Sequence, residues 1–169
     1  MRIVVSDSSC LIDLRKVSLL DALLRLPCEF LIPDILFEDE LLKFTGAQKK
    51  TLIRGGLQVI DMPGERVLRA QAVIRQSPRL SVHDGFAFAL AEHHPGCILL
   101  TGDGALRTLA AQHKMDVHGV LWVIDELHRN GVLKARTLLA ALKTFSSDST
   151  VRLPARELSA SIKRFSGLK

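Results

Sequence analysis

The chain has 169 residues, a length that suits one ordinary domain with a full core and is short for two. Its hydrophobic fraction of 47% and charged fraction of 24% are typical of a soluble globular protein, and no apolar run approaches the roughly 18 residues that a membrane span needs. The formal net charge of +5 favours polyanionic partners only modestly, so function must be argued from motifs.

The N-terminal residues and the cysteines predict a cytoplasmic protein. The apolar run at 3–5 is too short for a secretory signal and is typical of a buried first strand. Cys10, Cys28 and Cys97 are widely spaced and odd in number. This pattern favours reduced thiols and argues against a disulfide framework or a zinc knuckle.

Short β-type runs alternate with longer helical patterns along the chain, which predicts a parallel α/β sheet. Strands are expected at 3–5, 30–32, 57–60 and 97–100, with a fifth edge strand at 117–118. Helices are expected at 11–26, 35–44, 65–76, 82–93, 105–113, 120–129, 135–145 and 155–165. We expect residues 1–130 to form the sheet domain and residues 131–169 to form a helical C-terminal extension packed on the same domain.

Acidic residues are predicted to gather at the carboxyl edge of this sheet, where open parallel sheets bind ligands. Asp7 directly follows the first strand, and Asp103 lies three residues after the fourth. Asp84 falls in the first turn of the helix that leads into the fourth strand. The opening turns of the helix after the second strand are expected to carry Glu38, Asp39 and Glu40.

Each acid taken singly also has a structural explanation. Asp7 or a neighbouring serine could cap the first helix, and Asp103 is a natural N-cap. Asp84, three residues after Ser81, fits the acidic half of a capping box. The acids at 38–40 could form a solvated face near a helix N-terminus, where negative charge is favoured. Their convergence on one rim is harder to explain this way, because like charges repel unless a cation neutralises them.

Hard oxygen ligands of this kind suit Mg²⁺ or Mn²⁺. A cation of this type, bound by one or two carboxylates, can activate a water and stabilise a leaving oxygen. The substrate that this chemistry predicts is a phosphodiester.

Four short segments resemble motifs of the PIN-domain family, which includes the VapC-type toxins of bacterial toxin–antitoxin pairs. They occur in the family's order over roughly residues 2 to 118: Val5-Ser6-Asp7-Ser8-Ser9-Cys10-Leu11-Ile12, Ile32-Pro33 with the later Glu40-Leu41, His83-Asp84-Gly85-Phe86-Ala87, and Leu99-Leu100-Thr101-Gly102-Asp103. Each motif is short, and the specificity lies in their order.

The resemblance implies a three-layer α/β/α fold with a central parallel sheet of four to five strands and extra C-terminal helices. It implies a Mg²⁺- or Mn²⁺-dependent ribonuclease that cuts single-stranded RNA, with Asp7, Glu40, Asp84 and Asp103 as the catalytic and metal-binding acids. Glu38 is the alternative for the second acid. The resemblance also implies a homodimer and, for a toxin, an antitoxin protein as partner. Gly104 and Ala105 stand where family members often carry a fifth acid, so a second metal site is not expected to be strong.

Other functions and other residues stay open. A phosphatase with a nucleophilic aspartate usually needs a second aspartate two residues after the first, where Ser9 stands here. A catalytically silent RNA- or partner-binding protein on the same fold is the main alternative, because fold does not fix function. Ser8 and Thr101 could hold a metal-bound water or serve as ordinary turn residues, and His83 is a candidate substrate contact.

The cationic and aromatic residues outside the acid motifs have two interpretations each. Arg107 could meet a phosphate or be solvated, and Trp122 is expected in the core or at a dimer interface. The basic C-terminal residues could extend an RNA path, although a solvated amphipathic helix is the simpler interpretation; they are Arg152, Arg156, Lys163, Arg164 and Lys169.

Overall fold

A five-stranded parallel sheet forms the middle layer of the computed structural model, which describes residues 1–168. The strand order is β3-β2-β1-β4-β5. The strands are β1 (Arg2–Ser6), β2 (Cys28–Pro33), β3 (Gln58–Ile60), β4 (Ile98–Leu100) and β5 (Asp116–His118). The order reverses between β1 and β4, so the crevice beyond the carboxyl ends of these two strands is the expected ligand site of such a sheet.

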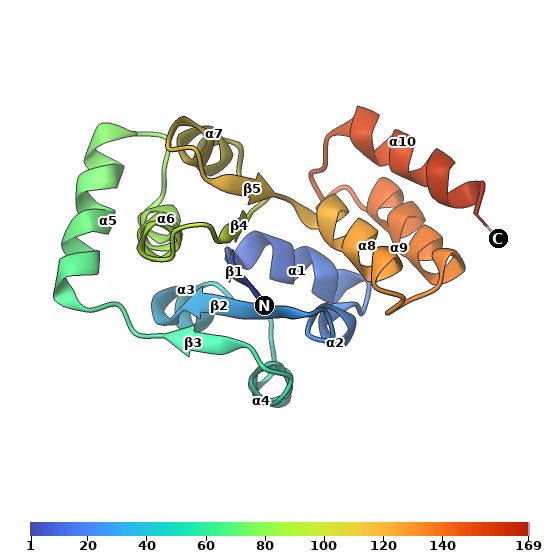
Figure 1. Cartoon of the computed structure of the whole chain (residues 1–169), viewed down its shortest axis with the longest axis horizontal. Coiled ribbons are helices and arrows are strands. Elements are labelled where there is room, and N and C mark those ends of the chain that lie inside the picture. The colour runs from blue at the N-terminus through green and yellow to red at the C-terminus, as the bar shows by residue number, and fades with distance from the viewer. Residues whose placement is uncertain (169) are drawn as a thin grey trace.

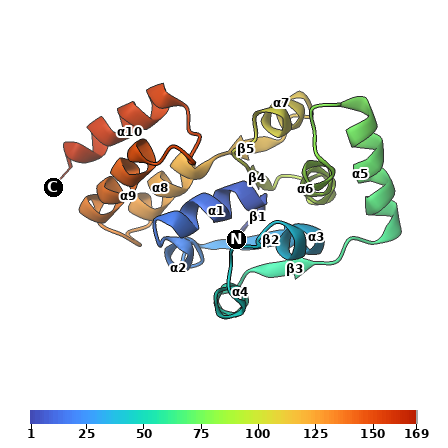
Figure 2. The same cartoon turned by 180° about the vertical axis from the view of Figure 1, so that it is seen from behind.

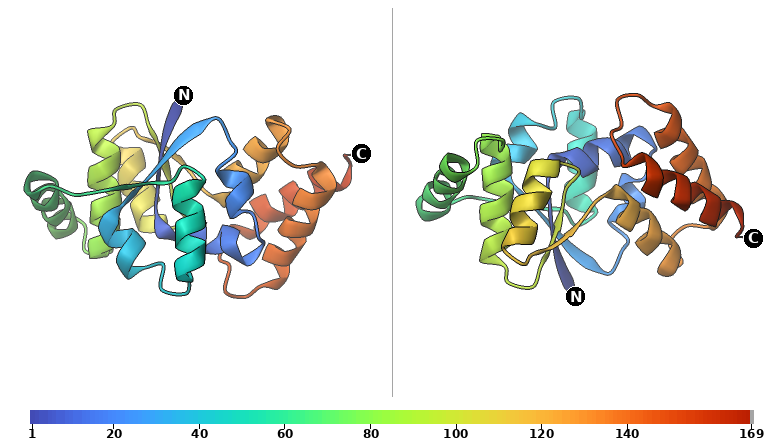
Figure 3. Two further views of the ribbon diagram at one scale, coloured as in Figure 1. Left: turned by 90° about the horizontal axis from the view of Figure 1, so that it is seen from below. Right: turned by 90° about the horizontal axis from the view of Figure 1, so that it is seen from above.

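Helices cover both faces of the sheet. They are α1 (Ser8–Lys16), α2 (Leu20–Leu23), α3 (Asp34–Asp39), α4 (Gly46–Arg54), α5 (Gly64–Gln76), α6 (Val82–His93), α7 (Gly104–Gln112), α8 (Val120–Arg129), α9 (Ala135–Ser147) and α10 (Ala155–Ser166). Helices α3, α6 and α7 lie on one side of the sheet and α1, α2 and α8 on the other (Figure 1). Helix α5 packs outside α6, while α9 and α10 follow outside α8, and the views from behind, below and above show the same succession (Figures 2 and 3). The expected three-layer α/β/α fold with a parallel sheet is confirmed.

The core explains why the strands are so short and apolar. Val4, Val5, Leu99 and Leu100 are fully buried because helices cover both faces of β1 and β4. The helices beyond residue 130 share this core, since Phe145, Leu158 and Phe165 belong to the same buried cluster. The division at residue 130 stays a prediction, and Lys169 at its end lies outside the described residues.

The predicted helix 35–44 was wrong in its second half. Helix α3 ends at Asp39, and Glu40 is its C-cap residue. Leu41 and Phe44 turn inward and are buried, which ends the helix at this point. Glu40 therefore lies at the C-terminal end of a helix and not in its opening turns, so the helix dipole does not favour its charge.

Two further local features differ from expectation. Helix α4 was not predicted, although Thr45 and Gln48 form a capping box at its start. The predicted helix 11–26 is two helices, because the chain turns at Ser18, whose φ of 58° lies in the left-handed region. The leucines of this segment are divided between α1 and α2, so their spacing does not indicate one continuous helix.

Within residues 1–168, the helices are all too short or too polar to cross a lipid bilayer.

Helices α5 and α6 approach each other most closely at Gly85. A Cβ added there would lie 2.7 Å from Ile74 Cδ1 and 2.9 Å from the Ala70 carbonyl oxygen. We expect Gly85→Ala to lower the free energy of unfolding by about 1 kcal/mol, because the overpacking cost exceeds the gain in helix propensity. Denaturant unfolding measures this change.

Gly64→Ala is the matched control, because Gly64 begins α5 and a Cβ there meets no atom within 4 Å. Its stability should equal or slightly exceed that of the wild type. Equal stability of the two variants would show that α5 does not pack on Gly85 as closely as described.

Candidate functional site

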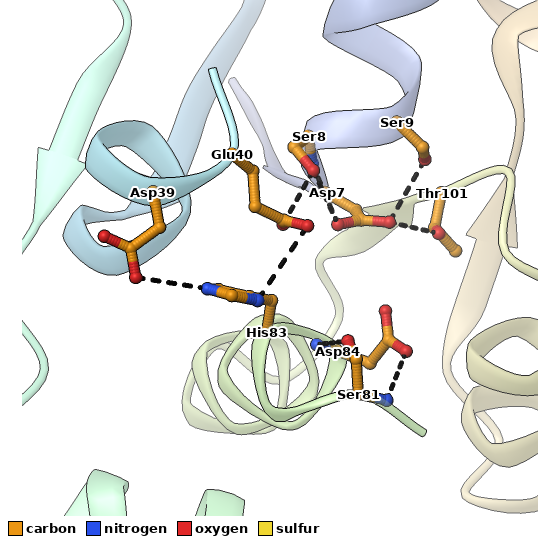
Figure 4. A network of polar contacts seen from close by, with 9 residues as sticks. All are labelled: Asp7, Ser8, Ser9, Asp39, Glu40, Ser81, His83, Asp84 and Thr101. Atoms are coloured by element: carbon orange, nitrogen blue, oxygen red, sulfur yellow. Dashed lines mark hydrogen bonds and ion pairs between the residues drawn. The ribbon is translucent and has the colours of Figure 1, made fainter. Parts of the chain in front are cut away.

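Asp7 occupies the switch point of the sheet. It directly follows β1, and its backbone N–H donates a 2.8 Å hydrogen bond to the carbonyl of Leu100 at the end of β4. The residue is only 3% exposed. Its carboxylate caps α1 by accepting from the Ser8 N–H at 2.8 Å. It also accepts from the hydroxyls of Ser9 at 3.1 Å and Thr101 at 2.8 Å (Figure 4).

The charge on Asp7 is held at an electrostatic cost. Burial raises the pKa of the Asp7 carboxyl above its ordinary value, and the negative charge of Glu40 raises it further. The hydrogen bond from Thr101 acts against this rise, as do those from Ser9 and Ser8. A cation beside Asp7 would relieve both the burial cost and the repulsion from Glu40.

Glu40 reaches the same point from the end of α3. Its Oε1 accepts a 2.7 Å hydrogen bond from the Ser8 hydroxyl, so Ser8 contacts both Asp7 and Glu40. On the other side, His83 Nδ1 lies 3.9 Å from Glu40 Oε2 while its Nε2 lies 3.2 Å from Asp39 Oδ2 (Figure 4). These contacts place Glu40 in the site, and among the described residues none joins Glu38 to it.

Asp84 faces the cluster from α6. It completes the capping box expected with Ser81, and its Oδ2 accepts from the Ser81 N–H at 2.8 Å. Only 8% of the residue is exposed. Burial raises the pKa of the Asp84 carboxyl, the hydrogen bond from the Ser81 backbone acts against this rise, and the charges of Asp103 and Asp7 raise the pKa further. Asp84 thus belongs to the same electrostatic neighbourhood as the acids of the sheet edge.

Asp103 combines its predicted capping role with a place in the cluster. Its Oδ1 accepts from the Leu106 N–H at 2.8 Å, which caps α7. Its own N–H donates to the Thr101 hydroxyl at 3.0 Å, and that hydroxyl donates in turn to Asp7. Thr101 therefore connects the acids that follow β1 and β4.

The structure also shows contacts of Ser9 and Asp39 that the sequence did not indicate. Ser9 links Asp7 to the loop after β4. Its hydroxyl donates to the Asp7 carboxylate and accepts from the Gly102 N–H at 3.0 Å. Asp39 pairs with His83, which joins the end of α3 to the start of α6. The sequence signals for Ser9 are its place in the first family-like motif and its position in a Ser-Ser pair directly after a strand-ending aspartate.

The donor set fits a hard divalent cation. Within residues 1–168, no three His, Cys, Asp or Glu side chains form a ready-made cluster that could hold a metal ion. The fit between these acids and a divalent cation therefore rests on the chemistry of their oxygen atoms. Carboxylate oxygens are the ligands that Mg²⁺ prefers, and Mg²⁺ keeps several waters while taking one or two carboxylates. Burial first, and neighbouring negative charges second, raise the pKa values of Asp7 and Asp84, and a bound cation would offset both effects.

Comparison with known proteins gives one finding. A protein-family model described as a PIN domain matches residues 3–166. The match continues through α8, α9 and α10, well past residue 118, where the motif resemblance stopped. No curated protein matches the chain.

Removing the charge of Asp84 should stabilise the metal-free protein. The amide oxygen of Asp84→Asn can still accept from the Ser81 N–H, while the cost of burying the charge and the repulsion from Asp103 and Asp7 are both removed. We expect the thermal midpoint in EDTA at pH 7 to rise by a few degrees, which corresponds to about 1 kcal/mol for a domain of this size. Calorimetry or circular dichroism measures the midpoint.

The pH dependence of this difference has a definite sign. Because the folded-state pKa of Asp84 is raised, its ionised form opposes folding above that pKa, and the penalty disappears as the pH falls through it. The gap between variant and wild type should therefore close as the solution is acidified. Asp61→Asn, in an exposed loop, is the control and should match the wild type. A destabilised Asp84→Asn would contradict the proposed repulsion.

Proposed function

The chain belongs to the PIN-domain family, a nuclease-type family, and on that premise we propose that it is a divalent-metal-dependent endoribonuclease acting on single-stranded RNA. One observation carries the proposal. A buried carboxylate, Asp7, lies at the switch point of the sheet beside three other acids that share its electrostatic environment. Burying a carboxylate among like charges is costly unless a cation compensates for it.

The residues that would hold Mg²⁺ or Mn²⁺ are Asp7, Glu40, Asp84 and Asp103. Such an ion, when bound, supplies an activated water and stabilises the developing charge on the leaving oxygen. The other residues of the chain hold these four acids in position. Their hydroxyls hold the carboxylates of Asp7 and Glu40, backbone N–H groups at the starts of α6 and α7 hold Asp84 and Asp103, and His83 lies between Asp39 and Glu40.

Further parts of the proposal rest on the family resemblance. They are a homodimer and the role of toxin with an antitoxin protein as partner; the proposed cytoplasmic location rests instead on the N-terminal residues and the cysteines. Co-expression with a small protein encoded beside this chain tests the last of these, since an antitoxin would copurify and suppress nuclease activity.

The main test is cleavage of a labelled single-stranded RNA in Mg²⁺, Mn²⁺ or EDTA. We expect metal-dependent cleavage by the wild type, and losses on the order of 10²-fold or more in Asp7→Asn and Asp103→Asn, the scale on which removal of one preorganised group acts in an active site. Asp61→Asn should cleave like the wild type.

Absence of metal-dependent cleavage, or equal cleavage by all variants, would contradict the proposal. Retained RNA binding without cleavage would then favour the catalytically silent binder on the same fold. Unchanged cleavage by Asp7→Asn would instead indicate a contaminating nuclease.

Thr101 is expected to act as a positioning residue. Its hydroxyl is fully buried and connects Asp7 with the backbone of Asp103. Thr101→Val keeps the shape but frees one Asp7 oxygen, so we expect metal affinity to fall by about 10–100-fold, as for other outer-shell partners. Activity should recover in part at high metal concentration.

Metal titration of the cleavage rate measures this effect. Thr101→Ser keeps the hydroxyl and should restore the wild-type metal dependence. A lower rate in Thr101→Val without a shifted metal dependence would show that Thr101 serves folding alone.

A further inference from the structure

A cavity of about 440 Å³ lies between α10 and the carboxyl ends of β4 and β5. Its walls include Gly102 and Gly119, which follow those strands, Trp122 on α8, and Leu153 and Ala160 at the C-terminal side. Ligand pockets typically measure about 300–1,000 Å³, so the cavity has the size of a small-molecule or single-nucleotide site. The acids of the proposed active site do not line it.

The cavity is nevertheless contiguous with that site. Gly102, in its wall, donates from its N–H to the Ser9 hydroxyl, which donates to Asp7. Arg107, also in the wall, donates through Nη1 at 3.3 Å to the carbonyl of Thr101, the residue whose hydroxyl holds Asp7. Two residues of the cavity wall therefore contact the groups that hold Asp7 in place.

The charges of the lining favour an anion. Arg164 pairs with Asp125, and Asp13 pairs with Lys16 at 3.5 Å. Among the described residues, Arg107 and Arg152 have no acidic partner, and Glu157 is the remaining acid of the lining. The lining alone carries three arginines and three acids, and Lys16, which pairs with Asp13 from outside it, leaves one net positive charge next to a cluster of carboxylates that would repel phosphate.

The rest of the lining is apolar. The Trp122 indole stacks on His118, with ring centroids 5.1 Å apart and an interplanar angle of 19°. Val120, Leu121, Leu153 and Pro154 add aliphatic surface. A wall that is partly aromatic and aliphatic, with arginines beside it, matches a ligand that carries both a flat apolar group and a negative charge.

We infer that this cavity receives one nucleotide of the RNA strand, beside the phosphodiester that is cut. The inference rests on the proposed function and adds the strand's path. A strand whose phosphate lies at Asp7 must continue along the carboxyl edge of the sheet. On the side of β4 and β5 that edge leads through Gly102 and Gly119 into the cavity, where Arg107 and Arg152 offset the repulsion from the acids.

Two variants test the inference, each with a matched control a few residues away in the chain. Arg152→Glu reverses a charge of the lining, and Arg156→Glu makes the same change outside it. Ala160→Trp fills the cavity from an exposed position of α10, and Ser159→Trp places the same bulk one residue away, outside the lining. All four positions are exposed, and circular dichroism checks that each variant folds.

Binding is measured with the full chain in EDTA, by fluorescence anisotropy of a labelled single-stranded RNA of roughly 12 nucleotides. We expect Arg152→Glu and Ala160→Trp to raise the dissociation constant about tenfold, and their controls to stay near the wild type. The salt dependence of binding should also become shallower in Arg152→Glu, by about one phosphate contact.

Equal affinities for each variant and its control would overturn the inference, as would absence of RNA binding by the wild type. Cleavage in Mg²⁺, measured in parallel, distinguishes a failure of this inference from a failure of the proposed function. If the wild type cleaves RNA and all four variants bind RNA alike, the proposed nuclease activity stands and the cavity does not lie on the RNA path. If RNA binding follows the expected pattern but the wild type does not cleave RNA, the role of the cavity stands and the proposed nuclease activity is contradicted.

Discussion

The burial of the Asp7 carboxylate at the switch point of the sheet is the constraint on which the site depends. The strand order reverses between β1 and β4, so the chain leaves these adjacent strands on opposite faces and opens a crevice at their carboxyl ends. Asp7 lies at that point with almost no exposure. The hydrogen bonds from Ser8, Ser9 and Thr101 hold its carboxylate but do not cancel the cost of burial or the repulsion from Glu40.

The same side chains serve the fold and the site. Asp7 and Asp103 are the N-caps of α1 and α7, and Asp84 completes the capping box of α6, so each helix start fixes a carboxylate at the sheet edge. Capping satisfies the free N–H groups of the helix, and the helix in turn fixes the position of the acid. The capping and catalytic interpretations of these residues are therefore compatible, because one oxygen of Asp84 and one of Asp103 meet the backbone while the rest of each carboxylate remains for a ligand.

The C-terminal helices give the molecule a second feature beside the acids. Helix α10 packs on α9. Residues of α10 and of the segment before it face the loops after β4 and β5, and together they enclose a cavity next to the sheet edge. Its arginines and aromatic wall differ chemically from the carboxylate cluster. An acidic site that acts on a polyanion needs cationic surface nearby, and the segment between α9 and α10 contributes Arg152 to that surface.

Local chemistry in the sequence determined the strands, most helix bounds and the positions of Asp7, Asp84 and Asp103 at helix starts, because β-branched runs, caps and strand-ending aspartates act over a few residues. Helix α8 begins and ends where its apolar period predicts, and Ser81 and Asp103 cap as expected. Tertiary structure decided the rest. The end of α3 and the position of Glu40 follow from the burial of Leu41 and Phe44, and the contacts of Ser9 with Gly102 and of Asp39 with His83 join segments far apart in the chain. No local pattern encodes such pairs, since only the packing of helices on the sheet brings them within hydrogen-bonding distance.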